Sequence, residues 1–175
     1  MSDIVARRSI PVVESDVDRV VASWVQSQTA LGAAMRDLPT TSPQAARSAQ
    51  ATENVWRAIE AEFGLLTGTE VGRLLGSTSA SSRNLAASKH KFGVLLAVQR
   101  GKALRYPGFQ FRQGDVLSVI GDLRKLANQH DWTEASTILW MVAPHGRLSG
   151  RRPVDIIDDP EQVLEVAAFA MAAEW

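Results

Sequence analysis

The 175-residue chain contains no cysteine and only three histidines. The absence of cysteine excludes disulfide bonds and thiolate metal sites. The histidines, His90, His130 and His145, are too far apart in sequence to form a paired ligand motif, so we expect no metal. The chain also has no recognisable nucleophile-base pair, paired-carboxylate motif or phosphate-binding loop. We therefore predict that it is not an enzyme, with no catalytic residues, no cofactor and no small-molecule substrate.

Long apolar runs are missing as well. The opening residues, MSDIVARRSIPVVESD, contain no extended apolar stretch, and no run approaches the roughly 18 apolar residues of a membrane span. Hydrophobic content of 45% and charged content of 22% are ordinary for a globular protein. We expect a cytoplasmic protein that neither crosses nor binds a membrane.

Acidic residues are absent from one long segment. Between Val71 and Gly114 there are eight Lys or Arg and no Asp or Glu, although the whole chain has 19 residues of each charge. The segment 1–70 has nine acids and six bases, and the segment 115–175 has ten acids and five bases. Such a segregated basic segment predicts an anionic partner, and its punctuation by turns favours double-stranded DNA.

The N-terminal region, residues 1–63, is predicted to be helical with a linker near residues 39–50. Apolar residues at three-four spacing predict a helix over Glu14–Leu38. Its apolar stripe fits core packing or a dimer seam, with a ligand groove as the alternative. The segment PTTSPQAARSAQ has linker composition, and a second helix is predicted over Thr52–Phe63 with Gly64 at its end.

Residues 64–112 are predicted to form a winged helix-turn-helix. Thr67 and Glu70 have the spacing of a capping box, which would open a helix over Gly68–Leu75. Three apolar side chains of this helix are expected to face a core, namely Val71, Leu74 and Leu75.

A second, polar helix is predicted over Ser79–Ser88, after a break at Gly76-Ser77. This order is typical of a helix-turn-helix, with an ordinary helical hairpin as the alternative. Arginine can bond guanine, asparagine can bond adenine, and short hydroxyls can reach phosphates. The DNA-binding residues predicted here are Thr78, Ser79, Ser81, Ser82, Arg83, Asn84, Lys89 and Lys91.

A β-hairpin is expected next, with strands over Val94–Val98 and Leu104–Tyr106. Basic residues at the tip and on the shaft of such a wing are expected to contact phosphates, although some could be ordinary surface charges. These residues are Arg100, Lys102 and Arg105. Phe109 and Phe111 have a spacing of two and are predicted to pack in the core from one extended segment.

Residues 113–175 are predicted to form a helical module, which makes the fold class mainly α with a small β-hairpin wing. Helices are predicted over Asp115–Ala127, 131–141 and 160–175, with a short helix opening at Pro153 between the last two. Asp131 and Glu134 are predicted to form a second capping box. The pair Asp158-Asp159 is better explained as a helix N-cap than as a catalytic dyad.

The C-terminal module contains a helix ending at Trp140, a loop with Pro144, and the motif Leu148-x-Gly150-Arg151-x-Pro153. With the preceding helix-turn-helix, this order resembles the Xre/MbcA/ParS-type antitoxins of RES-domain toxins over about residues 65–175. His145 and Ser149 depart from the usual loop pattern.

The resemblance implies an antitoxin of a type II toxin-antitoxin system. Such a protein binds operator DNA to repress its own operon and neutralises a cognate toxin through its C-terminal module. The toxin-binding residues implied by the resemblance are Leu148, Gly150, Arg151, Arg152 and Pro153, together with the final helix. Trp175 is added as a candidate anchor because Trp is a typical hot-spot residue, with packing on its own subunit as the alternative.

A stand-alone transcription regulator whose C-terminal module only dimerises is the other hypothesis. It would share the DNA-binding half but have no toxin partner. In either case we expect a homodimer, because helix-turn-helix proteins usually bind two-fold operators. The helix at 14–38 or the C-terminal module could supply the dimer interface.

Overall fold

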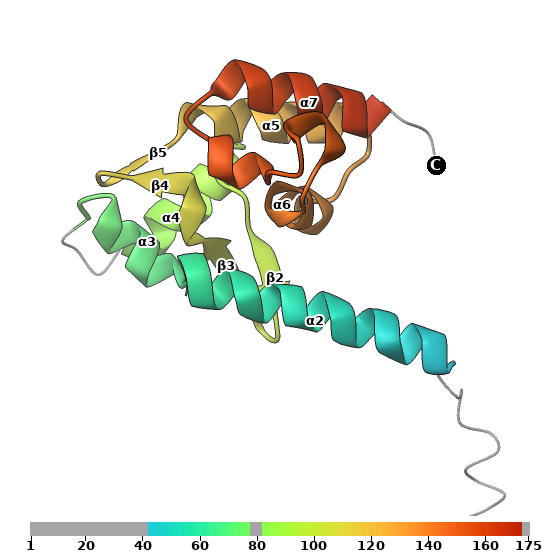
Figure 1. The fold of residues 1–175 in the computed structure, drawn as a ribbon. Coiled ribbons are helices and arrows are strands. Elements are labelled where there is room, and N and C mark those ends of the chain that lie inside the picture. Colours follow the sequence, from blue (N-terminus) through green and yellow to red (C-terminus); the bar gives the residue numbers. More distant parts are fainter. Residues whose placement is uncertain (1–41, 78–81, 173–175) are drawn as a thin grey trace, which may run out of the picture. The chain divides into compact units, whose positions relative to one another are not determined.

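The computed structural model describes residues 42–77 and 82–172. The predicted helix at 14–38, the residues Thr78, Ser79 and Ser81, and Trp175 lie outside the described residues. The chain divides into two compact units, residues 1–47 and 48–175. The fold is mainly α with a small antiparallel β component, as the sequence predicts (Figure 1).

Helix α2 (Pro43–Phe63) begins earlier than predicted, so residues 43–50 are helical, although the boundary between the two compact units falls within the predicted linker, after Arg47. The side-chain oxygen of Ser42 accepts a hydrogen bond from the Ala45 N–H at 3.1 Å. Pro43 then takes the first helical position, where its missing N–H costs nothing. A Ser-Pro pair that resembles linker composition is here a helix start. Gly64, at φ +79°, follows the end of the helix as predicted.

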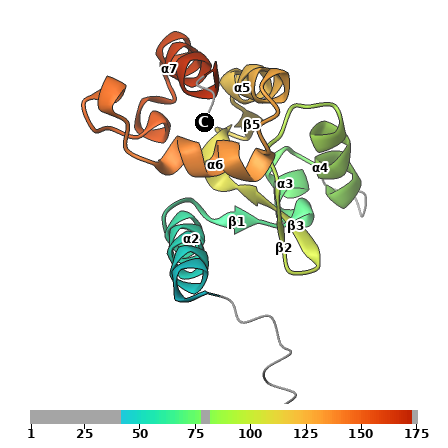
Figure 2. The same ribbon diagram turned by 90° about the vertical axis from the view of Figure 1, so that its right-hand side faces the viewer.

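Three short strands form one antiparallel sheet in the order β1-β3-β2, built from β1 (Leu65–Leu66), β2 (Val98–Arg100) and β3 (Ala103–Pro107). The β2–β3 hairpin lies beside α3 and α4 in Figure 2. The predicted strand over Val94–Val98 is wrong except at its last residue. Instead, the Leu96 N–H and C=O bond the side chain of Gln110 at 2.9 and 3.0 Å. This side-chain pairing replaces a strand neighbour.

Helices α3 (Gly68–Leu74) and α4 (Ser82–Lys91) pack against each other and against the sheet. The predicted capping box of α3 is present, with the Glu70 N–H donating to Thr67 and the Thr67 N–H donating to the Glu70 carboxylate at 2.7 Å. These bonds lower the pKa of Glu70. Val71 is fully buried and Leu75 packs beside it, but Leu74 is exposed, contrary to the prediction.

The C-terminal helices are α5 (Ser118–Gln129), α6 (Glu134–Val142) and α7 (Pro160–Ala172). Helix α5 starts later than predicted, because Asp115 and Val116 form strand β5, paired with β4 (Phe111–Arg112). The predicted cap of α6 is wrong. Thr133 caps it by accepting the Ser136 N–H at 3.0 Å. Asp159 caps α7 as predicted, accepting the Gln162 N–H at 3.1 Å.

Three short 3-10 turns complete the described chain, η1 (Gly108–Gln110), η2 (Gly146–Leu148) and η3 (Pro153–Ile156). Phe109 is buried as predicted and meets Phe63 edge-to-face, with ring centroids 5.6 Å apart. However, η1 turns the chain between Phe109 and Phe111, so this segment is not extended as predicted. Phe111 packs partly buried against a different apolar cluster.

The larger core joins residues from both sides of position 112. Trp56 and Ile59 of α2 lie in it together with Leu96, Phe109 and the inward faces of α5, α6 and α7. Figure 1 shows α5 and α7 side by side above the hairpin and α3. The segments 64–112 and 113–175 therefore share one core. None of the helices in the described part of the chain has the length and apolar character needed to cross a bilayer.

Candidate functional site

The turn between α3 and α4 depends on a close approach at Gly72. A Cβ atom there would lie 2.1 Å from the backbone oxygen of Ser82, so only glycine fits. Gly76, at φ +82°, donates to the Arg73 oxygen, and Ser77 donates to the Gly72 oxygen, which is a Schellman ending. The predicted DNA contact by Ser82 is wrong, because Ser82 is buried at this crossing with its hydroxyl 3.3 Å from the Ser77 oxygen.

The outward face of α4 carries four of the predicted DNA-binding residues. Arg83 and Asn84 are exposed in its first turn, and Lys89 and Lys91 lie in its last turn, half-buried and exposed respectively. The helix contains no acidic residue. The two lysines suit the negative end of the helix dipole. The helix therefore carries a cation in its first turn and cations in its last turn, with small residues between them.

A groove of about 540 Å³ brings the helix and the wing together. Arg83 of α4 lines it beside Lys102 and Arg105 of the hairpin. Thr67 and Thr69, at the start of α3, add hydroxyl-bearing side chains to the same wall. A cation of α4 and two cations of the hairpin, which follows about twenty residues later in the sequence, thus line one concave surface.

Arg100 does not lie free at the hairpin tip as predicted. Its guanidinium donates to the Glu53 carboxylate of α2 at 2.5 Å and lies 5.6 Å from the centre of the Trp56 ring. This hydrogen bond lowers the pKa of Glu53. Arg100 therefore holds the hairpin on α2, while Lys102 is exposed at the turn.

Glu134 lies at the centre of a polar cluster that the sequence did not indicate. Its carboxylate accepts hydrogen bonds from Arg124 of α5 at 2.6 Å and from the Ala97 N–H at 2.7 Å. The His90 Nε2 atom, at the end of α4, lies 3.0 Å from both carboxylate oxygens. Arg124 also donates to the Leu95 and His90 carbonyl oxygens, at 2.7 and 2.5 Å. The cluster fixes the C-terminal end of α4 on α5 and α6.

Tyr106 packs beside this cluster from strand β3. It is almost completely buried, and its ring meets the His90 ring edge-on at a centroid distance of 6.2 Å. Burial raises the pKa of the Tyr106 hydroxyl, and the negative charge of Glu134 raises it further.

Most of the loop side chains that the resemblance implies to bind a toxin make contacts within the chain itself. Leu148 and Pro153 are buried in the core, so the prediction that their side chains contact a toxin is wrong. Arg152 donates to both Glu62 carboxylate oxygens, at 2.8 and 2.7 Å, and to Asp155 at 2.6 Å. These bonds raise the pKa of Arg152. Arg152 is thus an internal clamp, against the prediction.

Two predicted residues of that loop are exposed, Gly150 and Arg151. Gly150 has φ +82° and Ser149, before it, has φ +55°, so the loop makes a left-handed turn at this point. This turn presents Arg151 outward, with only a 3.4 Å contact from its Nε to the Leu148 oxygen.

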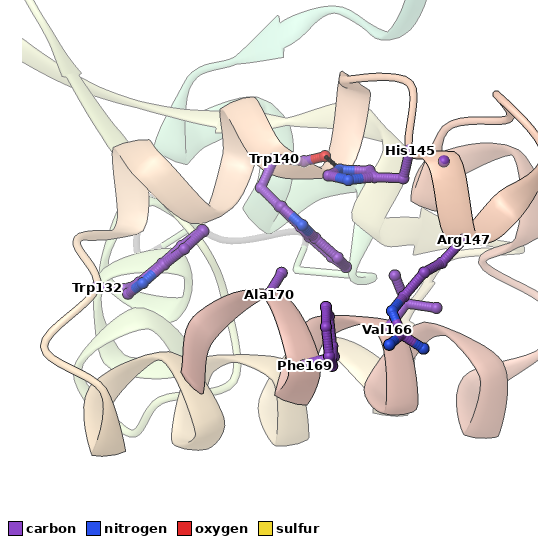
Figure 3. A pocket seen from close by; sticks show the side chains of 8 residues that line it. Trp132, Trp140, His145, Arg147, Val166, Phe169 and Ala170 are labelled. Atoms are coloured by element: carbon purple, nitrogen blue, oxygen red, sulfur yellow. Dashed lines mark hydrogen bonds between the residues drawn. The ribbon is translucent and has the colours of Figure 1, made fainter. Parts of the chain in front are cut away.

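Beside this loop is an apolar pocket of about 320 Å³ between α6, η2 and α7 (Figure 3). Trp132, Trp140 and Phe169 supply its aromatic walls. Phe169 is 57% exposed, and the Arg147 guanidinium lies 3.4 Å from its ring centre. The His145 Nε2 atom is 3.2 Å from the Trp140 backbone oxygen. The sequence predicts the final helix that carries Phe169, but it contains no signal that this helix borders a pocket.

Comparisons with known proteins give one informative similarity. No protein-family model matches the chain, and no curated protein sequence matches it. A solved structure, the NMR structure of Rv2175c, is similar to it with a TM-score of 0.53 and 23% sequence identity. The similarity covers 63% of this chain and 81% of that one. The chain therefore shares its fold with Rv2175c over most of the latter's length.

Proposed function

We propose that this chain is a transcription regulator that binds double-stranded operator DNA, with α4 as the recognition helix and the β2–β3 hairpin as the wing. The observation that carries the proposal is the common groove. Arg83 from α4 and Lys102 and Arg105 from the hairpin line the same concave surface, although the hairpin follows α4 only after a buried connection.

The residue types of the groove fit two kinds of contact with a duplex, to base edges and to phosphates. Arg83 and Asn84, in the first turn of α4, have side chains that can bond guanine and adenine edges in a major groove. Lys102 and Arg105 supply point contacts for phosphates, which give affinity and orientation but no sequence information. Each phosphate neutralised steepens the salt dependence of binding by roughly 0.9 in the logarithmic slope.

The test is binding of the full chain to a duplex taken from directly upstream of its own reading frame, compared with a shuffled duplex at several salt concentrations. Arg83→Ala should weaken specific binding by about 1–3 kcal/mol and reduce the preference over the shuffled duplex. Lys125→Ala is the matched control, because Lys125 is an exposed cation of α5 outside the groove. Binding that does not depend on salt, or an Arg83→Ala variant that binds like the control, would overturn the proposal.

Toxin neutralisation is the second candidate function, which the resemblance to RES-toxin antitoxins implies. One observation favours it over a module that only dimerises. Gly150 and Arg151 are exposed next to a pocket with a half-exposed Phe169. Coexpression with a small RES-type neighbouring gene tests it. Toxicity that persists in the presence of this chain would remove this candidate and leave the DNA-binding proposal intact.

A further inference from the structure

The pocket formed by Trp132, Trp140, Val166, Phe169 and Ala170, with His145, Gly146 and Arg147 at its edge, has the size and walls of a binding site. We call it the α6–α7 pocket. Its volume of about 320 Å³ is at the lower end of ordinary ligand sites, which span about 300–1,000 Å³. A pocket of this size takes one large side chain rather than a cofactor.

The wall of the pocket is apolar and rigidly held. Trp140 and Val166 are buried at 6% and 8% exposure and belong to the larger core. Phe169 is the exception, because its ring borders the pocket but remains half-exposed. Figure 3 shows Trp132, Trp140 and Phe169 arranged around the same space. An apolar side chain placed there would cover Phe169 and remove apolar surface from water.

The edge of the pocket carries a positive charge without a negative partner. Arg147 lies over the Phe169 ring and forms no ion pair with any carboxylate of the described chain. Arg151, exposed on the same loop, likewise has no acidic partner within ion-pair distance among the described residues. A ligand that carries a carboxylate next to its apolar group would pair with this edge.

Trp140 provides a second polar feature. Its indole Nε1 atom is buried and has no hydrogen-bond partner in the part of the chain that the structure describes. Buried indole N–H groups usually find an acceptor, and an unmet one is costly. Trp140 borders the pocket through its apolar ring surface, whereas this N–H is closed off behind the pocket wall and does not select the ligand.

We propose that the α6–α7 pocket binds a protein partner through one large apolar or aromatic side chain that is flanked in sequence by Asp or Glu. The arrangement is that of an interface hot spot, with an anchor side chain in an apolar pocket and charge pairing at its rim. The inference rests on the second candidate function only in naming a protein as partner. It uses none of the residues of the DNA groove.

The probe is a pair of short blocked peptides, acetyl-Asp-Phe-Asp-amide and acetyl-Lys-Phe-Lys-amide, titrated into the ¹⁵N-labelled full chain. Indole N–H signals are assigned with Trp132→Phe and Trp140→Phe variants. We expect the acidic peptide to shift the Trp132 and Trp140 signals in a saturable way and to leave the signal of Trp56, a buried residue of α2 that does not line the pocket, unmoved. The basic peptide should bind roughly tenfold more weakly, the factor that about 1.4 kcal/mol of charge pairing gives.

Two surface variants make the result specific. Arg147→Glu should reverse the preference between the two peptides, and Phe169→Ala should weaken both. Because both side chains are exposed, neither change should unfold the chain, and DNA binding serves as the control for folding. Equal affinity for both peptides, or no saturable shift with either, would overturn the proposal. Tighter peptide binding by Trp175→Ala would also overturn it, since the occupant would then be the chain's own Glu174-Trp175 segment.

Discussion

A Cβ atom on Gly72 would lie 2.1 Å from the backbone oxygen of Ser82. Non-bonded carbon and oxygen atoms do not approach this closely, so the α3–α4 crossing exists only because residue 72 has no side chain. The crossing sets the angle at which α4 presents Arg83 and Asn84. The placement of the proposed recognition helix therefore depends on Gly72, a residue inside the α3–α4 crossing and not on the exposed face of α4.

Gly72→Ala should destabilise the chain by about 3 kcal/mol, because backbone must move to relieve the overlap. Gly121→Ala is the matched control. In α5 the added methyl would lie 3.8 Å from the Gly93 oxygen, an ordinary contact, and alanine favours helix by roughly 0.5–1 kcal/mol over glycine. In urea unfolding, Gly72→Ala should therefore lower the free energy of unfolding, whereas Gly121→Ala should raise it slightly. A Gly72→Ala variant as stable as the wild type would contradict the described crossing.

Arg100 and Lys102 lie two residues apart at the wing but should behave differently. Lys102→Ala should lower the salt slope of DNA binding by about one and leave stability unchanged. Arg100→Ala should leave the slope unchanged and slightly reduce stability, through loss of its bond to Glu53 and its contact with Trp56. Fluorescence titrations at several salt concentrations, with urea unfolding, separate the two effects. A reduced slope for Arg100→Ala would mean that it leaves Glu53 to contact phosphate.

Glu134 should be a stabilising residue whose loss also affects DNA binding. In Glu134→Gln one side-chain oxygen becomes a donor that faces Arg124, His90 or the Ala97 N–H. A donor facing a donor should cost about 2 kcal/mol. Because His90 is at the end of α4, DNA affinity should fall as well. Glu165→Gln, at an exposed site of α7, is the control and should change stability by less than about 0.5 kcal/mol.

Tyr106 gives a spectroscopic view of the same region, because it is the only tyrosine of the chain. Burial and then the charge of Glu134 raise its pKa, so its absorbance titration should have a midpoint above the ordinary value of 10.0. Because the pKa of Tyr106 is raised in the folded state, the neutral hydroxyl contributes to the stability of the fold. This contribution is fully present below pH 10.0 and is lost as the pH rises through the raised pKa. Glu134→Gln should lower the midpoint but leave it raised, because burial is the larger cause. A midpoint at or below 10.0 would contradict the burial of Tyr106.

The elements whose signals are local could be predicted from the sequence. The capping box at Thr67 and Glu70 and the Asp159 cap depend on residues three apart, and both are present. The basic character of α4 is likewise a property of adjacent residues. These features can be predicted without any information about tertiary contacts.

The errors arise where a distant partner decides the role of a side chain. Arg100 and Arg152 look like free surface cations in the sequence, but Glu53 and Glu62 of α2 pair with them in the fold. Glu134 has capping spacing, yet it turns towards Arg124 and His90 instead. Such choices depend on tertiary contacts that periodicity and spacing do not contain.

Arg152 gives a prediction with a pH dependence. Its bonds lower the pKa of Glu62 and of Asp155 below their ordinary values of 4.5 and 3.8. For lowered acids the stabilisation is fully present above the ordinary values and is lost as the pH falls through the lowered ones. At neutral pH, Arg152→Ala should cost about 1 kcal/mol, a modest figure because both carboxylates are partly exposed to solvent. Its neighbour Arg151→Ala, which breaks no ion pair of the described chain, should cost little.

Urea unfolding at neutral pH and at about pH 3 should show the difference between Arg152→Ala and the wild type shrinking in acid. A difference that stays constant with pH would mean that the packing of Arg152 against Phe63, and not its charge, holds the loop on α2.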